Sequence, residues 1–281
     1  MTWLIYTVIS VVAASFINLL QKLSMKDENS DPLPYAIALQ FSAALICLAF
    51  AFAKGFEMPP IKEYPLNFFL EAILYAFGSL FSFKALKLIE ASEGTVILSF
   101  CSVVTITASA VFLKESLTPQ GLLGAALIII SIILVSKLKD FSVNKGVFYA
   151  LIAAMFYGLA VVNDAYLLKF SDPTSYTSIA FLLPGVLLSL LYLNSLKKLK
   201  GFLRPKSAKI MFLLAFVWSV SAIAFYIAIE KGALASQISP ISQSKVILTV
   251  LLAAIFLKER DNLPAKIAAA LMTIMGVMMI R

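Results

Sequence analysis

Residues 235–259, ASQISPISQSKVILTVLLAAIFLKE, form an apolar run of helical length with Lys245 near its middle. A run of this length can cross a hydrocarbon core about 30 Å thick as one helix. A charged side chain at that depth costs about 2.5 to 3.5 kcal/mol on insertion scales, so it usually faces a cavity lined by protein or water. The stretch therefore predicts a membrane helix, and it makes Lys245 the first candidate for a binding residue.

The rest of the chain has the same apolar character. Hydrophobic residues make up 61% of it and charged residues only 14%, whereas soluble proteins are about 45 to 50% apolar. Apolar runs recur at short intervals without the alternation that strands would show, which favours a helical bundle over a barrel. The expected fold class is an all-α integral membrane protein with ten transmembrane helices. The expected spans are 3–23, 34–53, 66–88, 94–113, 118–136, 145–168, 173–193, 208–228, 234–257 and 262–280.

The remaining composition excludes several function classes. The net charge is +8, but the basic residues lie in short connections beside apolar spans, where they indicate topology and not nucleic-acid binding. The chain contains no histidine, which excludes zinc-protease and Ser-His arrangements. Cys47 and Cys101 both fall inside apolar runs, so neither a disulfide framework nor a metal site is inferred from them. We therefore expect no cofactor, no metal and no enzyme activity.

An internal repeat organises the spans. Residues 91–115 align with residues 235–259 at an offset of 144, with nine identities in 25 positions. Both segments begin with Ala-Ser and end with Phe-Leu-Lys-Glu. The chain is thus interpreted as two five-helix repeats, 1–140 and 141–281, and an odd number of spans inverts the second relative to the first. Inverted repeats are typical of secondary transporters, whose substrate site lies near the midplane.

Two five-span halves, whose fourth spans end in Phe-Leu-Lys-Glu ahead of a proline, resemble the EamA-type domains of the drug/metabolite transporter superfamily. The resemblance covers nearly the whole chain. It implies a ten-helix transporter of small organic solutes, with a central cavity walled mainly by the first four helices of each half. The family's fourth span often carries small or apolar residues at its centre. Lys245 departs from that pattern, which restricts the range of ligands expected for this chain.

The distribution of Lys and Arg and the family resemblance predict opposite orientations of the chain in the membrane. Of the 23 Lys and Arg residues, sixteen lie at the side of the membrane opposite the N-terminus and six at the N-terminal side, with Lys245 left over. The positive-inside rule then puts both termini outside, whereas the resemblance implies both termini in the cytoplasm. The expected location is the plasma membrane of a prokaryote.

A polar stripe runs along the helix that carries Lys245. Ser242 lies three residues before Lys245 and Thr249 four after it, so the three share one face. An ammonium group in a dry cavity attracts a carboxylate or a phosphate, which favours an anionic or zwitterionic substrate. The alternative is a permanent internal ion pair of Lys245 with Asp164 or Glu71.

Two further polar pairs are candidates. Tyr157 and Asp164 are seven residues apart and therefore lie on one helical face. Asn18 and Asn163 occupy comparable places in the two halves, which predicts two symmetric polar positions beside the cavity. The alternative is that these side chains lie close enough to a helix end to meet water at the interface.

Aromatic and charged residues on other spans complete the set. Tyr75 and Trp218 occupy corresponding places in the third and eighth spans, where their rings could stack on a substrate or simply pack. Lys84 either points inwards and reinforces an anion site or extends to the interface. Glu71 and Glu93 are assigned to helix starts, where negative charge is favoured in any case.

The sequence favours a secondary transporter or facilitator that moves a small anionic or zwitterionic metabolite, such as an amino acid, by alternating access. One alternative is a multidrug or organic-cation exporter of the same fold, and another is a membrane-embedded lipid-modifying enzyme. Expected partners are a small-molecule substrate, the lipid bilayer and a coupling proton or counter-substrate, with no nucleic acid. The predicted substrate-binding residues are Lys245, Ser242, Thr249, Asp164, Asn163, Tyr157, Asn18, Lys84, Trp218 and Tyr75.

Overall fold

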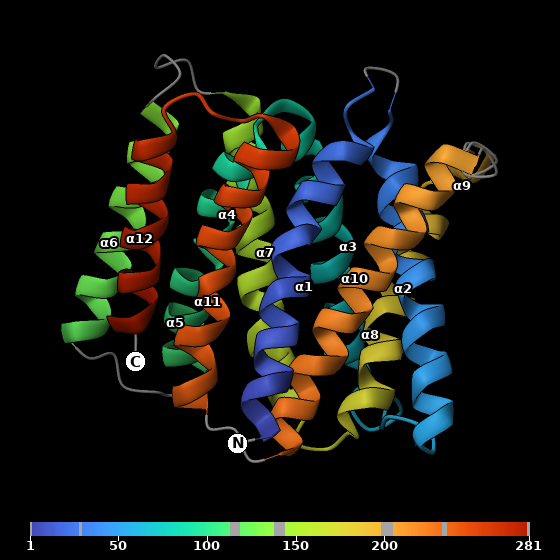
Figure 1. The fold of residues 1–281 in the computed structure, drawn as a ribbon. Coiled ribbons are helices and arrows are strands. Elements are labelled where there is room, and N and C mark those ends of the chain that lie inside the picture. The colour runs from blue at the N-terminus through green and yellow to red at the C-terminus, as the bar shows by residue number, and fades with distance from the viewer. Residues whose placement is uncertain are drawn as a thin grey trace.

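The computed structural model describes residues 2–27, 30–112, 119–137, 144–197, 205–231 and 235–279, and every regular element in these ranges is a helix (Figure 1). The prediction of an all-helical fold is confirmed for the described residues. The elements are α1 Thr2–Ser24, α2 Pro32–Lys54, α3 Pro65–Leu88, α4 Ala91–Leu98, α5 Cys101–Phe112, α6 Pro119–Lys137, α7 Lys145–Leu167, α8 Pro173–Leu191, α9 Leu193–Leu196, α10 Pro205–Glu230, α11 Ala235–Leu252, the π-helical turn η2 Ala253–Leu257 and α12 Leu263–Met279.

Seven described helices are long and apolar enough to cross a membrane, which makes the chain an integral membrane protein. Three shorter apolar helices, Pro119–Val135, Ser244–Leu257 and Leu263–Met279, lie in the remaining predicted stretches. The fourth predicted span comprises α4 and α5, and the ninth comprises α11 and η2.

Local sequence explains where many of the helices begin. A proline at the first helical position has the φ angle that a helix needs and lacks the N–H that would be left without a partner. The carboxylates of Asp31 and Asp172 and the amide oxygen of Asn144 accept hydrogen bonds from the backbone N–H of the second or third residue of their helices. The helices that begin with proline are α2, α3, α6, α8 and α10.

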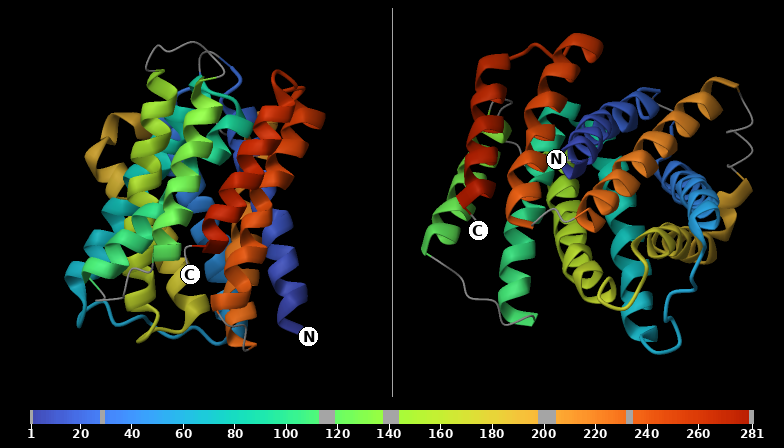
Figure 2. Two further views of the ribbon diagram at one scale, coloured as in Figure 1. Left: turned by 90° about the vertical axis from the view of Figure 1, so that its left-hand side faces the viewer. Right: turned by 60° about the horizontal axis from the view of Figure 1, so that its bottom comes forward.

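Segments far apart in the sequence pack side by side. Helix α3 packs on α7, α1 on α10, α2 on α8 and α6 on α12. The α6–α12 pair lies at one side of the bundle, and the α2–α8 pair lies towards the other (Figure 2). The first and second parts of the chain are therefore interleaved throughout the bundle.

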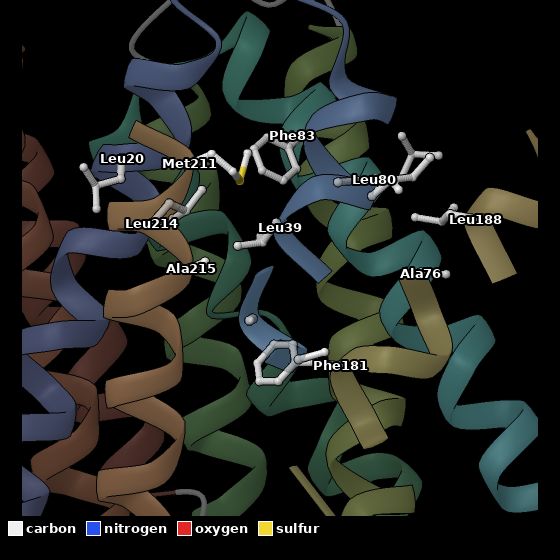
Figure 3. Packing of buried hydrophobic residues seen from close by; sticks show 14 of the residues in the cluster. Leu20, Leu39, Ala76, Leu80, Phe83, Phe181, Leu188, Met211, Leu214 and Ala215 are labelled. Carbon is white, nitrogen blue, oxygen red and sulfur yellow. The ribbon is translucent and has the colours of Figure 1, made fainter. Parts of the chain in front are cut away.

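The larger apolar core lies where α1, α2, α3, α8 and α10 meet (Figure 3). Leu39, Phe83 and Leu214 are fully buried there. Close packing elsewhere needs small residues, because a Cβ at Gly276 would lie 2.6 Å from the carbonyl oxygen of Gly124. The two glycines therefore let α12 pack closely on α6. Small residues at helix–helix contacts are typical of membrane proteins.

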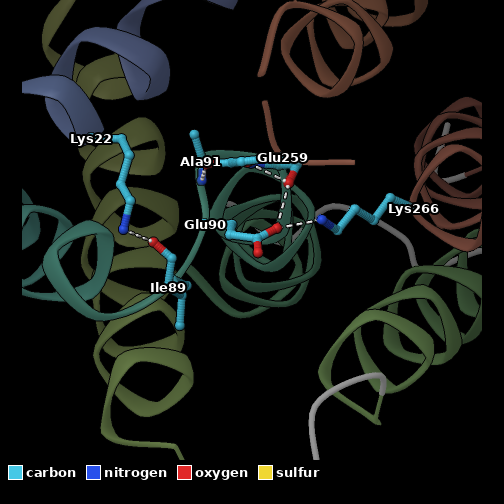
Figure 4. Close-up of polar contacts among 7 residues, drawn as sticks. Lys22, Ile89, Glu90, Ala91, Glu259 and Lys266 are labelled. Carbon is cyan, nitrogen blue, oxygen red and sulfur yellow. Dashed lines mark hydrogen bonds and ion pairs between the residues drawn. The ribbon is translucent and has the colours of Figure 1, made fainter. Parts of the chain in front are cut away.

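Charged groups tie the connections together at one end of the bundle (Figure 4). The Glu259 carboxylate accepts hydrogen bonds from the backbone N–H groups of Ala91 and Ser92, both 2.9 Å, at the start of α4. Lys266 pairs with Glu90, and Lys22 donates to the Ile89 carbonyl at 2.6 Å. The last residue of the second Phe-Leu-Lys-Glu motif thus caps α4. The corresponding Glu115 lies outside the described residues.

Candidate functional site

A central cavity lies between helices from both parts of the chain. It consists of two neighbouring pockets of about 300 and 280 Å³ that share Ala14, Tyr75, Trp218, Ser221 and Lys245 in their walls. Lining residues come from α1, α3, α4, α5, α7, α10 and α11. The central cavity is lined by Ser10, Val11, Ala14, Ile17, Asn18, Gln21, Tyr75, Ser82, Thr95, Leu98, Ser99, Cys101, Tyr157, Val161, Trp218, Ser221, Ala222, Phe225, Ser242, Lys245 and Val246.

Lys245 is the one charged residue among these described lining residues. Within the described part of the chain it forms no ion pair. The two carboxylates that the sequence offered as partners are bound elsewhere, Asp164 to Tyr75 and Tyr176 and Glu71 to Asn163. A positive charge with no counter-ion in the described part of the chain therefore faces the cavity.

Polar groups beside Lys245 also lack partners. Gln21 is fully buried; its Oε1 accepts a hydrogen bond from Ser82 at 3.3 Å, but its Nε2 has no partner among the described residues. The hydroxyl of Ser242 likewise has none in the described ranges. Asn18, in contrast, donates to the Thr95 hydroxyl at 2.8 Å. Buried polar groups are nearly always hydrogen-bonded in native proteins, so the Gln21 and Ser242 groups await a ligand or water.

Four aromatic residues line the cavity: Tyr75, Tyr157, Trp218 and Phe225. The rings of Tyr75 and Tyr157 lie with centroids 6.0 Å apart, and Trp218 meets Phe181 edge to face at 6.2 Å. A Cβ at Gly78 would lie 2.9 Å from the Tyr157 ring, so glycine is what lets that ring fit. The structure thus brings six predicted site residues together in the cavity walls: Lys245, Ser242, Tyr157, Asn18, Trp218 and Tyr75.

Asp164 and Asn163 belong to a second polar group, which we call the carboxyl cluster: Glu71, Tyr75, Asn163, Asp164 and Tyr176. The hydroxyls of Tyr75 and Tyr176 each donate to a different Asp164 oxygen at 2.6 Å. Asn163 donates to Glu71 Oε2 at 2.8 Å. The two carboxyl groups lie within hydrogen-bonding reach of each other. Tyr75 connects this cluster to the central cavity, since its ring lines the cavity and its hydroxyl reaches Asp164.

Besides Asp164 and Asn163, two further predicted site residues lie outside the cavity walls. The Thr249 hydroxyl is buried and donates to the Ser15 carbonyl at 3.0 Å, and it has an exact counterpart in Thr105, which donates to the Gly158 carbonyl at 3.0 Å. The Lys84 ammonium lies over the rings of Phe81 and Tyr149, 5.0 and 5.7 Å from their centroids. The first contact joins α11 to α1, and the second is a cation–π arrangement.

The interpretation of Glu71 as a helix-start residue is wrong. Helix α3 begins at Pro65, so Glu71 lies beyond its first turn, and the side chain is fully buried in the carboxyl cluster. The predicted start of this span, residue 66, is within one residue of Pro65, so the error lay in counting Glu71 as part of the first turn. Glu93, by comparison, does lie in the first turn of α4. Gln21 was also missed, although it follows Asn18 on the same face of α1, and that spacing was a usable signal.

Comparisons with known proteins place this geometry in a family. A model of the EamA-like transporter family matches residues 1–137 and 144–281. A solved structure described only as "Crystal structure of protein" has 15% sequence identity and a TM-score of 0.65, with 100% of this chain and 97% of the other covered. At that identity the similarity shows the fold alone. No curated protein matches the sequence.

Proposed function

The chain belongs to the EamA-like transporter family, and on that premise we propose that it is a secondary transporter or facilitator that moves a small organic anion through the central cavity by alternating access. The family makes it a membrane transporter of the drug/metabolite transporter superfamily. The substrate class and the mechanism are what we propose. The observation that supports them is that Lys245 lines the central cavity without an ion pair among the described residues.

The packing of the helices supports two inverted five-helix repeats, 1–140 and 141–281, that together make ten spans. If the halves are equivalent, α1 corresponds to α7 and α3 to α10. The contact of α3 with α7 then has its equivalent in the contact of α10 with α1. Exchanging the two halves turns α2 into α8 and α6 into α12, so the α2–α8 and α6–α12 contacts are each unchanged by it. Repeats arranged in this way rock about a shared central site in secondary transporters.

The two threonine contacts support the same symmetry at atomic detail. Thr105 and Thr249 are identical positions of the repeat, and each hydroxyl donates at 3.0 Å to a carbonyl on the first helix of the other half. The accepting residues, Gly158 and Ser15, also occupy corresponding places, because their offset of 143 is within one residue of the repeat offset.

The charge of the cavity supports an anion over a zwitterion or a cation. Lys245 has no carboxylate near it in the described cavity wall, so the ammonium group of an amino acid would meet only amides, hydroxyls and aromatic rings. A carboxylate or phosphate would instead meet Lys245 and the Gln21 Nε2 donor. Because charge interactions are strong at low dielectric, the unpaired ammonium disfavours an organic-cation substrate. The pocket volumes suit a small molecule.

We propose the plasma membrane of a prokaryote as the location of the protein. The sequence contains no nucleotide-binding loop. Movement of the substrate against its gradient would therefore require a coupling proton or a counter-substrate.

Binding to the full chain in lipid nanodiscs tests the substrate class. Two matched series are used: 4-methylpentanoate, leucine and isoamylamine, and 3-phenylpropanoate, phenylalanine and phenethylamine. Each series varies charge on one carbon skeleton, and glucose 6-phosphate adds a phosphate. We expect the anions to bind most tightly, and Lys245→Met to weaken them about 100-fold, which corresponds to about 2.8 kcal/mol.

Lys84→Met is the matched control, because it removes a lysine that lies on two aromatic rings outside the cavity walls. It should leave anion affinity within about twofold, an energy of roughly 0.4 kcal/mol. If the amines bind best and Lys245→Met changes no affinity, the anion proposal is wrong.

A further inference from the structure

The carboxyl cluster brings two acidic side chains into contact inside the membrane region. Glu71 is fully buried and Asp164 is 8% exposed. Glu71 is on α3, Asp164 is on α7, and the two carboxyl groups are within hydrogen-bonding reach. The cluster thus lies at the interface of two helices that belong to different halves of the chain.

No lysine or arginine in the described residues compensates this pair. The groups that face it are the Tyr75 hydroxyl from α3, the Tyr176 hydroxyl from α8 and the Asn163 amide from α7. Helices α5 and α8 contain no charged residue, and the one charged residue of α2, Lys54, lies in its last turn, where its charge acts on Asp172. Two carboxylates in contact without a cation cannot both be ionised at small cost, so the pair holds a proton.

Hydrogen-bond geometry locates this proton. Both Asp164 oxygens accept a tyrosine hydroxyl at 2.6 Å, a length typical of bonds to an ionised carboxylate. Glu71 Oε2 accepts from Asn163, whereas Glu71 Oε1 has no hydrogen-bond partner in the described part of the chain. A proton on Oε1, donated to Asp164, satisfies every polar atom of the pair.

The pair also lies between two cavities. On one side, Tyr75 reaches from Asp164 into the wall of the central cavity. On the other side, Asn163 and Asn67 line a separate pocket of about 380 Å³ between α3, α5 and α7. Asn67 Nδ2 donates to Asn163 Oδ1 at 2.9 Å, and Asn163 donates on to Glu71. A polar chain therefore runs from one cavity through the carboxyl pair to the other.

We propose that the Glu71–Asp164 pair is a proton-binding site that couples movement of the anion through the central cavity to a proton gradient; this coupling rests on the proposed function. On loading, the Glu71 carboxylate takes a proton from water in one cavity and becomes the neutral acid. On unloading, the acid returns that proton to water. Tyr75 keeps its own proton and positions Asp164 according to the occupancy of the cavity.

Infrared spectroscopy of the full chain in nanodiscs tests the proton site without any substrate. The wild-type spectrum at neutral pH, minus that of Glu71→Gln, should contain the carbonyl stretch of a protonated carboxylic acid. Glu63→Gln, which removes an exposed glutamate, should give no such difference. If the Glu71→Gln difference lacks this band while the variant remains folded by size exclusion and thermal unfolding, no proton is held there and the proposal is overturned.

Liposome transport tests the coupling, with 3-phenylpropanoate as the probe. An inward proton gradient should drive accumulation by the wild type and by Glu63→Gln, and Glu71→Gln should accumulate at least tenfold less. The ratio of gradient-driven uptake to exchange at equal pH should fall in Glu71→Gln, an effect that mere loss of folded protein would not produce. Equal ratios in the two proteins would overturn the coupling. If no anion is transported by any variant, the proposed function fails, whereas the infrared result still decides the proton site.

Discussion

The central cavity and the carboxyl cluster are both buried polar regions, yet they treat charge in opposite ways. In the cavity, Lys245 has no counter-ion among the described residues, and the Nε2 donor of Gln21 in the same pocket has no partner among them. In the cluster, Asp164 is held by two tyrosine hydroxyls. A buried charge that the protein leaves uncompensated marks a place for a ligand, because the ligand must supply what the protein does not. A compensated one is stable when the cavity is empty.

The largest effect should come from moving the uncompensated charge. Lys245→Cys should weaken 3-phenylpropanoate about 100-fold, since removing one partner of a buried ion pair costs at least about 2 kcal/mol. Adding Cys101→Lys places an ammonium group on α5, in another part of the wall of the same pocket. The double variant should recover about tenfold of the affinity, an energy of about 1.4 kcal/mol, measured by calorimetry in nanodiscs.

No recovery in a folded double variant would show that the position of the charge, and not merely its presence in the cavity, determines binding. Full affinity in Lys245→Cys alone would remove the contrast between the two regions.

Within the carboxyl cluster, the two acids should respond differently to neutral substitution. Asp164→Asn weakens two charge-assisted hydrogen bonds and should lower the free energy of unfolding by about 2 to 3 kcal/mol. Glu71→Gln keeps a donor towards Asp164 and an acceptor for Asn163, so it should cost less than about 1 kcal/mol. Thermal and denaturant unfolding in detergent gives the comparison. Equal losses in the two variants would mean that the proton is not on Glu71.

The paired threonines should show a smaller and symmetric effect. Thr249→Val and Thr105→Val each remove one hydrogen bond to a backbone carbonyl, and each should lower the free energy of unfolding by about 1 kcal/mol. Because neither hydroxyl lines the central cavity, anion affinity should stay within about twofold, roughly 0.4 kcal/mol. A loss of anion affinity in Thr249→Val but not in Thr105→Val would show that Thr249 contributes to substrate binding after all.

The smallest effect concerns a carboxylate outside the membrane-spanning segments. Burial alone would raise the pKa of Asp172, but hydrogen bonds from Thr174 and Ser175 outweigh it and hold that pKa below its ordinary value. Because the folded-state pKa is depressed, the stabilisation is complete above the unfolded pKa of about 3.9 and is lost as the pH falls towards the folded value.

Asp172→Ala should therefore cost about 1 kcal/mol at neutral pH, the usual value of a lost helix N-cap. The difference from the wild type should shrink below about pH 4, as measured by thermal unfolding across a pH series. Asp172→Asn, which keeps an acceptor but not the charge, separates the cap from the titration. A difference between wild type and Asp172→Ala that is constant with pH would show that the charge plays no part.

Much of the site could be predicted because helical spacing and the repeat are visible in the chain. Spacing on α11 placed Ser242 with Lys245, and the correspondence between halves paired Tyr75 with Trp218, all of which line the cavity. The same spacing also selected Thr249, whose hydroxyl instead contacts Ser15 on another helix. One helical stripe can face a cavity at one turn and a neighbouring backbone at the next, and spacing cannot distinguish the two.

The sequence by itself determined that the chain is a set of apolar helices, because a backbone in lipid must satisfy its own hydrogen bonds and long apolar runs have no other way to do so. It also identified the family and the one lysine that apolar surroundings make costly. Only the tertiary structure decided which charges are compensated. Tyr176, Glu71 and Asp164 come from three helices, and packing and interhelical hydrogen bonds, not hydropathy, select which helices meet in a membrane.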